Sequence, residues 1–348
     1  MWHDMSLLDK IRDKISGVIT PPPVIRVTMM GPRAVGKTTL MASIFSDTRE
    51  SVAGTGVYFR PTPETGKELI KKKLKLQSII SNRNSITDIP STGAIEATST
   101  ETTFNFEMGK SGRSHSVIIE IKDFPGEYLK SHPERVSQFI KESHIVMIAI
   151  DSPYLMEENG IYNEQKNEAI SVASFLECNP DAIKDKMILL VPLKSERYFH
   201  DSRLDELKEK VKTAYARIIA LSKQMNIACV ITPIQTLGHV EFDKFVDNTM
   251  GLGSLSKLSQ FRYYGREPKF MPMFCVQPLY YLLTYVANQY EWLTKQPTGI
   301  IDRLMNTIGS YLKEDDEFLH EIKKMGTNII YNQNGYELVV SNTILKLK

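Results

Sequence analysis

Two glycines and a lysine stand at a spacing that suits phosphate binding in the stretch GPRAVGKTT, Gly31 to Thr39, which fits the pattern G-x-x-x-x-G-K-[ST]. Glycines let the backbone bend and approach an anion, and the N–H groups at a helix N-terminus carry partial positive charge. The apolar run VIRVTMM precedes the stretch and the helical pattern TTLMASIF follows it. We therefore predict a phosphate-binding loop between a strand and a helix. Its expected nucleotide contacts are Gly31, Arg33, Ala34, Val35, Gly36, Lys37, Thr38 and Thr39.

Three side chains of this loop have distinct expected roles. The ammonium group of Lys37 would neutralise the β- and γ-phosphates, and the hydroxyl of Thr38 would ligate Mg²⁺. Arg33, the third residue of the loop, either adds positive charge to the phosphates or lies on the surface.

A second motif, DFPG at Asp123 to Gly126, follows the apolar run SVIIEIK. Its distance from the loop predicts that it ends the strand next to the first one. An aspartate at that point can hold magnesium through water, and the backbone N–H of Gly126 can sense the γ-phosphate. The alternative is an ordinary surface turn.

The succession of GPRAVGKTT and DFPG resembles the GTPase side of the P-loop NTPases over roughly residues 24 to 235. The stretches VTMMGPRAVGKTTL, VPLKSERYF, VITPIQTLG and FCVQPLYYLL resemble, more narrowly, bacterial double-GTPase type domains of the TRAFAC class, which are encoded beside conflict and defence modules. The resemblance implies GTP or GDP and Mg²⁺ as ligands. It also implies a GTP-hydrolysing switch in a bacterial signalling or antiviral defence complex.

The residue after DFPG is Glu127, where many GTPases have a glutamine that positions water. The glutamate could orient or activate water, or its charge could repel the γ-phosphate and slow hydrolysis. Both alternatives stay open. With Lys37 and Gly126, Glu127 completes the expected catalytic group.

The base-reading motif of GTPases, N-K-x-D, is replaced here by LKSE, Leu193 to Glu196. The stem of Lys194 can still stack on the base, and Glu196 could accept the two guanine N–H donors. Leucine in place of asparagine removes one polar support, and a surface loop that begins with a lysine and a glutamate is the alternative.

A threonine that binds Mg²⁺ and the γ-phosphate is expected just before the strand TTFNFEM. The tract ATSTETT offers several, of which we favour Thr98 and then Thr100, because Thr102 and Thr103 begin the strand. The alternative is that all four are ordinary polar residues before a strand.

Apolar runs of strand length alternate along the sequence with helical stretches, and these elements must position the residues named above. The alternation predicts an α/β fold: a doubly wound, mostly parallel sheet of the P-loop NTPase type. Runs such as IVMIAI and MILLV suit a sheet that is covered on both faces. The expected strands are Val24 to Met29, Thr102 to Glu107, Ser116 to Ile121, His144 to Ile150, Met187 to Val191 and Ile227 to Ile231, and the expected helices are Lys37 to Phe45, Glu134 to Lys141, Asn163 to Glu177 and Leu204 to Lys223.

We predict three parts in the chain: an amphipathic helix over 1–20, a P-loop domain over 21–298 with insertions near 48–101 and 237–272, and C-terminal helices with a hairpin over 299–348. The first helix docks on the protein's own body or serves a partner or a membrane surface. The basic run KKKLK at Lys71 to Lys75 is expected to be a solvated helix face.

Composition limits the remaining function classes. The 43 basic and 41 acidic residues leave a net charge of +2, so we expect no direct nucleic-acid binding, and no apolar stretch is long enough for a membrane span. Three scattered cysteines argue against a disulfide framework or a zinc site and favour a reducing cytoplasm.

The expected partners are guanine nucleotide and a protein partner or a second copy of the chain. The alternative functions are a nucleotide-binding scaffold with little hydrolysis and a P-loop ATPase or small-molecule kinase, against which DFPG argues.

Overall fold

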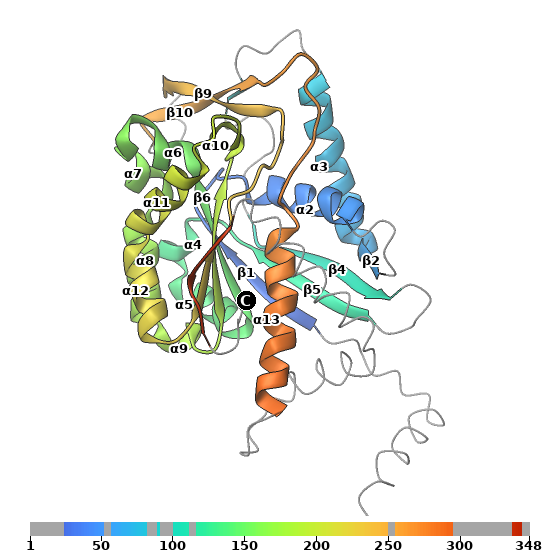
Figure 1. Cartoon of the computed structure of the whole chain (residues 1–348), viewed down its shortest axis with the longest axis vertical. Helices are drawn as coiled ribbons and strands as arrows, with labels where there is room; N and C mark the ends of the chain where they lie inside the picture. Colours follow the sequence, from blue (N-terminus) through green and yellow to red (C-terminus); the bar gives the residue numbers. More distant parts are fainter. Residues whose placement is uncertain are drawn as a thin grey trace, which may run out of the picture.

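A mixed sheet lies at the centre of the computed structural model, which describes residues 24–51, 57–81, 89–90, 100–110, 116–249, 255–294 and 336–342 (Figure 1). Its strand order is β11-β8-β7-β6-β1-β5-β4-β2. The strands from β8 to β5 run parallel, whereas β4, β2 and β11 are antiparallel to their neighbours. The strands are β1 (Val24–Met30), β2 (Val57–Pro61), β4 (Thr102–Lys110), β5 (Ser116–Asp123), β6 (Ile145–Asp151), β7 (Met187–Leu193), β8 (Ala228–Ile231) and β11 (Glu337–Val340).

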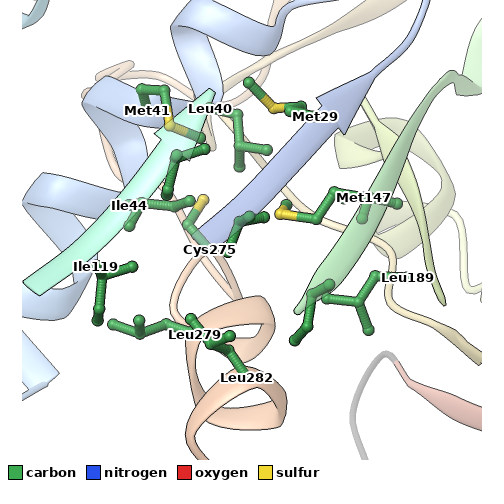
Figure 2. Packing of buried hydrophobic residues seen from close by; sticks show 14 of the residues in the cluster. Met29, Leu40, Met41, Ile44, Ile119, Met147, Leu189, Cys275, Leu279 and Leu282 are labelled. Atoms are coloured by element: carbon green, nitrogen blue, oxygen red, sulfur yellow. The ribbon is translucent and has the colours of Figure 1, made fainter. Parts of the chain in front are cut away.

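Helices cover both faces of this sheet, because its central strands are apolar on both sides. In β6, Met147 packs into the cluster formed with α2, α3 and α13, and its neighbour Ile148 packs into the cluster on the opposite face. Figure 2 shows Leu40 and Ile44 of α2 and Leu279 of α13 gathered around β1 and β6. The first face carries α2 (Lys37–Ser51), α3 (Pro63–Ser81) and α13 (Gln277–Thr294), and the second carries α5 (Pro133–Glu142), α8 (Ala169–Cys178), α9 (Pro180–Ile183), α11 (Leu204–Ala214) and α12 (Ala216–Gln224).

The predicted doubly wound, mostly parallel sheet is therefore confirmed. Two predicted helices are each divided in the structure. The stretch 163–177 forms α7 (Asn163–Asn167) and α8, because Glu168 between them has a φ of 51°. The stretch 204–223 forms α11 and α12, which meet at Tyr215, a residue with non-helical backbone angles.

Both predicted insertions contain regular structure. The segment 48–101 supplies the end of α2, then β2, which pairs with β4, and α3, which packs on α2. The segment 237–272 supplies β9 (Val240–Asp247) and β10 (Lys257–Tyr263), which pair antiparallel, and β10 also pairs with β3 (Ile89–Pro90). We call this second sheet, β3-β10-β9, the cap.

The cap lies at one end of the molecule, beside α6 (Ser152–Met156) and α10 (Glu196–His200) (Figure 1). The Tyr154 hydroxyl donates to the Lys257 carbonyl over 2.7 Å, and the Tyr263 hydroxyl donates to the Ile79 carbonyl over the same 2.7 Å. These two bonds join the cap to both sides of the main domain.

Several predictions fall on residues outside the described ranges: the helix over 1–20, the C-terminal helices and Thr98. The three-part division of the chain stays a prediction. Within the predicted C-terminal part, β11 pairs with β8 and so extends the main sheet. None of the helices in the described part of the chain is long and apolar enough to cross a membrane. Cys229 and Cys275 are buried and Cys178 is exposed.

Candidate functional site

The predicted phosphate-binding loop joins the end of β1 at Met30 to the start of α2 at Lys37. Gly31 and Gly36 have φ values of 148° and 113°, a region that favours glycine. A Cβ atom on Gly31 would stand 2.9 Å from the Ala149 carbonyl oxygen, so a side chain there would require the backbone to move. Both glycines are therefore required by the path of the loop.

The side chain of Lys37 folds back onto the first residues of the loop. Its Nζ donates to the carbonyl oxygens of Gly31 at 3.0 Å and Pro32 at 3.4 Å. The residue is only 5% exposed, and Thr38 beside it is also buried. The first two carbonyls of the loop thus accept hydrogen bonds from the loop's own lysine.

Two lysines from other elements hold the next two carbonyls. Lys166 of α7 donates to the Arg33 oxygen at 2.8 Å, and Lys194, which follows β7, donates to the Ala34 oxygen at 3.2 Å. A trans peptide places its C=O and N–H on opposite sides, so fixing the Arg33 oxygen directs the Ala34 N–H the other way. Ala34 also has a φ of 58°. A left-handed residue within a turn is one part of the anion-binding concavities called nests.

The DFPG motif lies against this loop. In the pairing of β1 with β5, Met29 stands opposite Asp123, which brings the aspartate to the same edge of the sheet. The Lys37 Nζ lies 3.7 Å from Asp123 Oδ1. Burial lowers the pKa of Lys37, and the negative charge of Asp123 opposes that shift. The structure therefore brings Lys37 and Asp123 together as the sequence predicts.

Gly126 packs directly on the loop backbone. A Cβ atom there would lie 2.8 Å from the Arg33 nitrogen and 2.8 Å from the Gly31 oxygen, distances that real Cβ atoms do not show. Any other residue at 126 would push DFPG and the loop apart.

Arg33 and Glu127 form an ion pair at the surface. Arg33 Nη1 lies 3.6 Å from Glu127 Oε1, and the two side chains are 68% and 54% exposed. Of the two alternatives for Arg33, the structure has the surface one. Exposed pairs of this kind contribute at most about 1 kcal/mol, so the pair holds the two side chains only loosely.

Lys194, the lysine expected to stack on the base, follows β7 and contacts the predicted loop. It has a φ of 58°, and its Nζ lies 2.5 Å from Asp151 Oδ2. The ring centroid of Phe261, in the cap, is 5.7 Å from the same nitrogen. Leu193 before it is fully buried. The lysine thus connects the loop, the end of β6 and the cap.

Glu196, expected to accept the guanine N–H groups, is engaged with the protein's own backbone. It is only 2% exposed, and its carboxylate accepts the Leu237 N–H at 2.7 Å and faces the Thr236 hydroxyl at 3.4 Å. Burial raises its pKa, and these hydrogen bonds oppose the shift. The carboxylate expected to face guanine is turned toward the protein's own backbone after β8.

Asp151 and Lys166 belong to the site but were not predicted from the sequence. Asp151 ends β6 and is fully buried. Its signal was present, because an acidic residue after an apolar strand lies at the carboxyl edge of the sheet, where such folds bind ligands. For Lys166, inside a stretch predicted as one long helix, the sequence offers no comparable signal.

The charges of the site do not balance. Lys37 and Lys166 are each 5% exposed and the Lys194 side chain is 13% exposed, and these three cations face the two buried carboxylates of Asp123 and Asp151. Burial lowers the pKa of Lys166 to about 8, with Asp151 opposing and the other two lysines adding to the shift. One net positive charge in a region of low dielectric attracts an anion.

Comparisons with known proteins give low structural similarity. No protein-family description and no curated protein matches the chain. The fold is similar to the GTPase-like domain of Ski7 from S. cerevisiae bound to GTP, with 18% identity, a TM-score of 0.39, and coverage of 64% of this chain and 45% of that one. The same domain bound to GDP and inorganic phosphate matches with 14% identity and a TM-score of 0.38, over 82% of this chain and 53% of that one.

A third structure, Era in complex with MgGDPNP and a segment of 16S ribosomal RNA, matches with 14% identity and a TM-score of 0.31, over 79% of this chain and 69% of that one. The chain thus spans about half the length of the Ski7 structures that it matches. At these scores, function has to be proposed from the site itself.

Proposed function

We propose that the protein binds a magnesium nucleoside triphosphate, GTP in the first instance, and hydrolyses it slowly as a regulatory switch. The observation that carries this proposal is the loop from Gly31 to Gly36, whose first four carbonyls accept hydrogen bonds from lysines. Held in this way, the loop offers N–H groups and net positive charge to a chain of phosphates.

The oxygen donors at the site fit a magnesium ion. Thr38, the second residue of α2, carries a hydroxyl, and Asp123 ends β5 with a buried carboxylate. Hard oxygen atoms are the ligands that Mg²⁺ prefers. Among the described residues, no group of three or more His, Cys, Asp and Glu could hold a metal by itself. Mg²⁺ usually takes one or two protein oxygens, waters and substrate phosphates, so Thr38 and Asp123 would suffice. When bound, the ion would neutralise charge on the phosphates.

Guanine is the proposed base because the LKSE stretch takes the place of the N-K-x-D motif in the GTPases that the sequence resembles. The contact of the Lys194 Nζ with the Ala34 carbonyl oxygen supports a place for this stretch beside the nucleotide. The engagement of Glu196 with Leu237 favours a second candidate, a site with little discrimination between GTP and ATP. For Glu196 to accept the guanine N–H pair, its hydrogen bond to Leu237 must open. A bound base would then replace that bond.

Slow hydrolysis is proposed from Glu127. A carboxylate beside a γ-phosphate repels it, and Arg33 offsets that charge only through an exposed pair. GTPases with no well-placed water or arginine finger turn over at about 10⁻⁴ to 10⁻² s⁻¹. A protein partner or self-association that accelerates turnover, a cytoplasmic location and a role in bacterial defence are proposed from the resemblance of the sequence motifs.

The first prediction tests nucleotide binding through Lys37→Ala. Loss of its ammonium group should weaken the binding of a fluorescent GTP analogue by about 10- to 100-fold or more, the range for a hydrogen bond to a charged group. Lys71→Ala, which removes an exposed lysine of α3, is the matched control and should bind normally. Competition by unlabelled GTP, GDP and ATP in the wild-type protein reports the base preference. Equal affinity of Lys37→Ala and wild type would contradict the proposed function.

A further inference from the structure

Lys166 is a buried cation that the expected phosphate-loop chemistry does not use. It is 5% exposed, and its Nζ donates to the Arg33 carbonyl oxygen over 2.8 Å. Lys37 serves the two preceding carbonyls and Lys194 the following one. Of the four loop carbonyls from Gly31 to Ala34, the Arg33 carbonyl is therefore the one whose lysine donor comes from neither the loop nor the LKSE stretch.

The segment around Lys166 is fixed rigidly to the sheet. The Asn167 side chain accepts the Asp151 backbone N–H at 2.8 Å and donates to the Asp151 carbonyl at 3.1 Å. The same amide nitrogen donates to Asn163 Oδ1 at 2.8 Å. Glu168 then takes a φ of 51°, which ends α7 after five residues. These hydrogen bonds set Lys166 against the loop.

The surroundings of Lys166 make its burial costly. The charged groups that act on it are Asp151 at the end of β6, Lys194 after β7 and Lys37 at the start of α2. The Tyr154 ring of α6 lies against it, with its centroid 5.5 Å from the Nζ. A buried ammonium beside two other cations destabilises the fold unless a further negative charge is bound. A purely structural lysine would be better placed on the surface.

We propose that Lys166 is a third lysine of the nucleotide site: a positioning residue that holds the Arg33 carbonyl outward, directs the Ala34 N–H toward the phosphates and adds its charge to their binding. This inference rests on the proposed nucleotide binding. It assigns to α7, an element outside the sequence motifs, a direct influence on phosphate affinity.

The test compares Lys166→Met and Lys166→Arg with the wild-type protein in titrations of a fluorescent GTP analogue at pH 7 and pH 9. Methionine keeps the length of the side chain without its charge, whereas arginine keeps a cation that does not titrate in this range. Lys184→Met, which removes an exposed lysine after α9, is the matched control. Thermal melting shows that each variant is folded.

We expect Lys166→Met to lose about 10- to 100-fold in affinity at pH 7, Lys166→Arg to recover part of the loss, and Lys184→Met to bind normally. Because the pKa of Lys166 is about 8, wild-type affinity should also fall from pH 7 to pH 9 more steeply than that of Lys166→Arg. The titration of the nucleotide itself is common to all variants and cancels in this comparison.

The outcomes separate the two proposals. If Lys166→Met binds like wild type while Lys37→Ala does not bind, the role of Lys166 is overturned and the nucleotide site stands. If the wild-type protein binds neither GTP nor GDP, both proposals fall. Should Lys166→Met not fold, parallel pH profiles for wild type and Lys166→Arg would by themselves overturn the role of Lys166.

Discussion

Single residues at the site have environments that stability alone would not favour. Ala34 and Lys194 both have φ values of 58°, which for residues other than glycine costs about 1 kcal/mol each. Lys37 and Lys166 are buried cations. Strained backbone and buried charge gather at functional sites, where a bound ligand offsets their cost.

The second prediction follows from the pKa of Lys166, which burial lowers from the ordinary 10.5 to about 8. Between pH 8 and pH 10.5, Lys166 is more protonated in the unfolded chain than in the folded one. The contribution of Lys166 to the free energy of unfolding therefore rises with pH in this range. Without added nucleotide, Lys166→Met should therefore be more stable than wild type at pH 7, by about 1 to 3 kcal/mol.

Urea denaturation at pH 7 and pH 10 checks this expectation. The advantage of Lys166→Met should shrink at pH 10, because the wild-type lysine is then neutral in the folded protein. A variant that is less stable than wild type by the same amount at both pH values would contradict a buried charged lysine. Together with weaker nucleotide binding, higher stability would mark Lys166 as a residue retained for function.

The third prediction concerns the pair Arg33 and Glu127. Glu127→Gln removes a negative charge near the proposed γ-phosphate site and should speed single-turnover GTP hydrolysis by up to about fivefold, the effect of about 1 kcal/mol between exposed charges. Arg33→Ala leaves the carboxylate unpaired and should slow hydrolysis by a similar factor.

Phosphate release after mixing with Mg²⁺ and GTP gives both rates, and the double variant shows whether the two effects are coupled. If Glu127→Gln is inactive, the carboxylate is the base that activates water. Wild-type turnover above about 1 s⁻¹ for the protein alone would argue against a slow switch.

At the scale of elements, strands and motifs with regular patterns can be predicted from the sequence, whereas a break within a helix cannot. The buried strands could be predicted because IVMIAI and MILLV are apolar throughout, and the loop because its glycines and Lys37 have a fixed spacing. The break between α7 and α8 could not, because a glutamate at a φ of 51° has no local signal. Lys166 was missed for that reason, since on one continuous helix it would read as an ordinary surface lysine. The hydrogen bond between Glu196 and Leu237 could not be predicted, because the two residues are distant in sequence.

The fourth prediction belongs to α7. Asn167→Ala removes the side chain that satisfies both backbone groups of Asp151, and it should lower the free energy of unfolding by about 2 to 4 kcal/mol, because buried polar groups lose their partners. It should also weaken GTP binding, since α7 carries Lys166.

Asn179→Ala, which removes a partly buried asparagine between α8 and α9, is the control for stability without an effect on binding. Urea denaturation and nucleotide titration give the two values. Loss of stability with unchanged affinity would separate α7 from the nucleotide site.

At the scale of the whole molecule, the cap joins parts that the sequence keeps far apart. Through β3 it holds Ile89 and Pro90, which precede the threonines expected to bind Mg²⁺, and through Phe261 it approaches Lys194. The Tyr154 and Tyr263 hydroxyls tie it to α6 and α3. If the threonines after β3 and Lys194 bind nucleotide as proposed, both contacts connect to β10, through its pairing with β3 and through Phe261.

The last prediction is that nucleotide state changes the opening of the cap. Backbone N–H groups exchange with solvent when their hydrogen bonds open, and ligands that bind the closed form slow that exchange. A GTP analogue that resists hydrolysis should slow exchange in β9 and β10 by about tenfold, and GDP should do so less, because the threonines expected to bind Mg²⁺ and the γ-phosphate follow β3 in the sequence. Hydrogen exchange measured by mass spectrometry follows both strands in one experiment. Lys37→Ala should show no change with either nucleotide.

Equal protection of the cap by GDP and by the GTP analogue would mean that the cap responds to the base and not to the γ-phosphate. Protection confined to the phosphate-binding loop would mean that the cap is a fixed part of the fold.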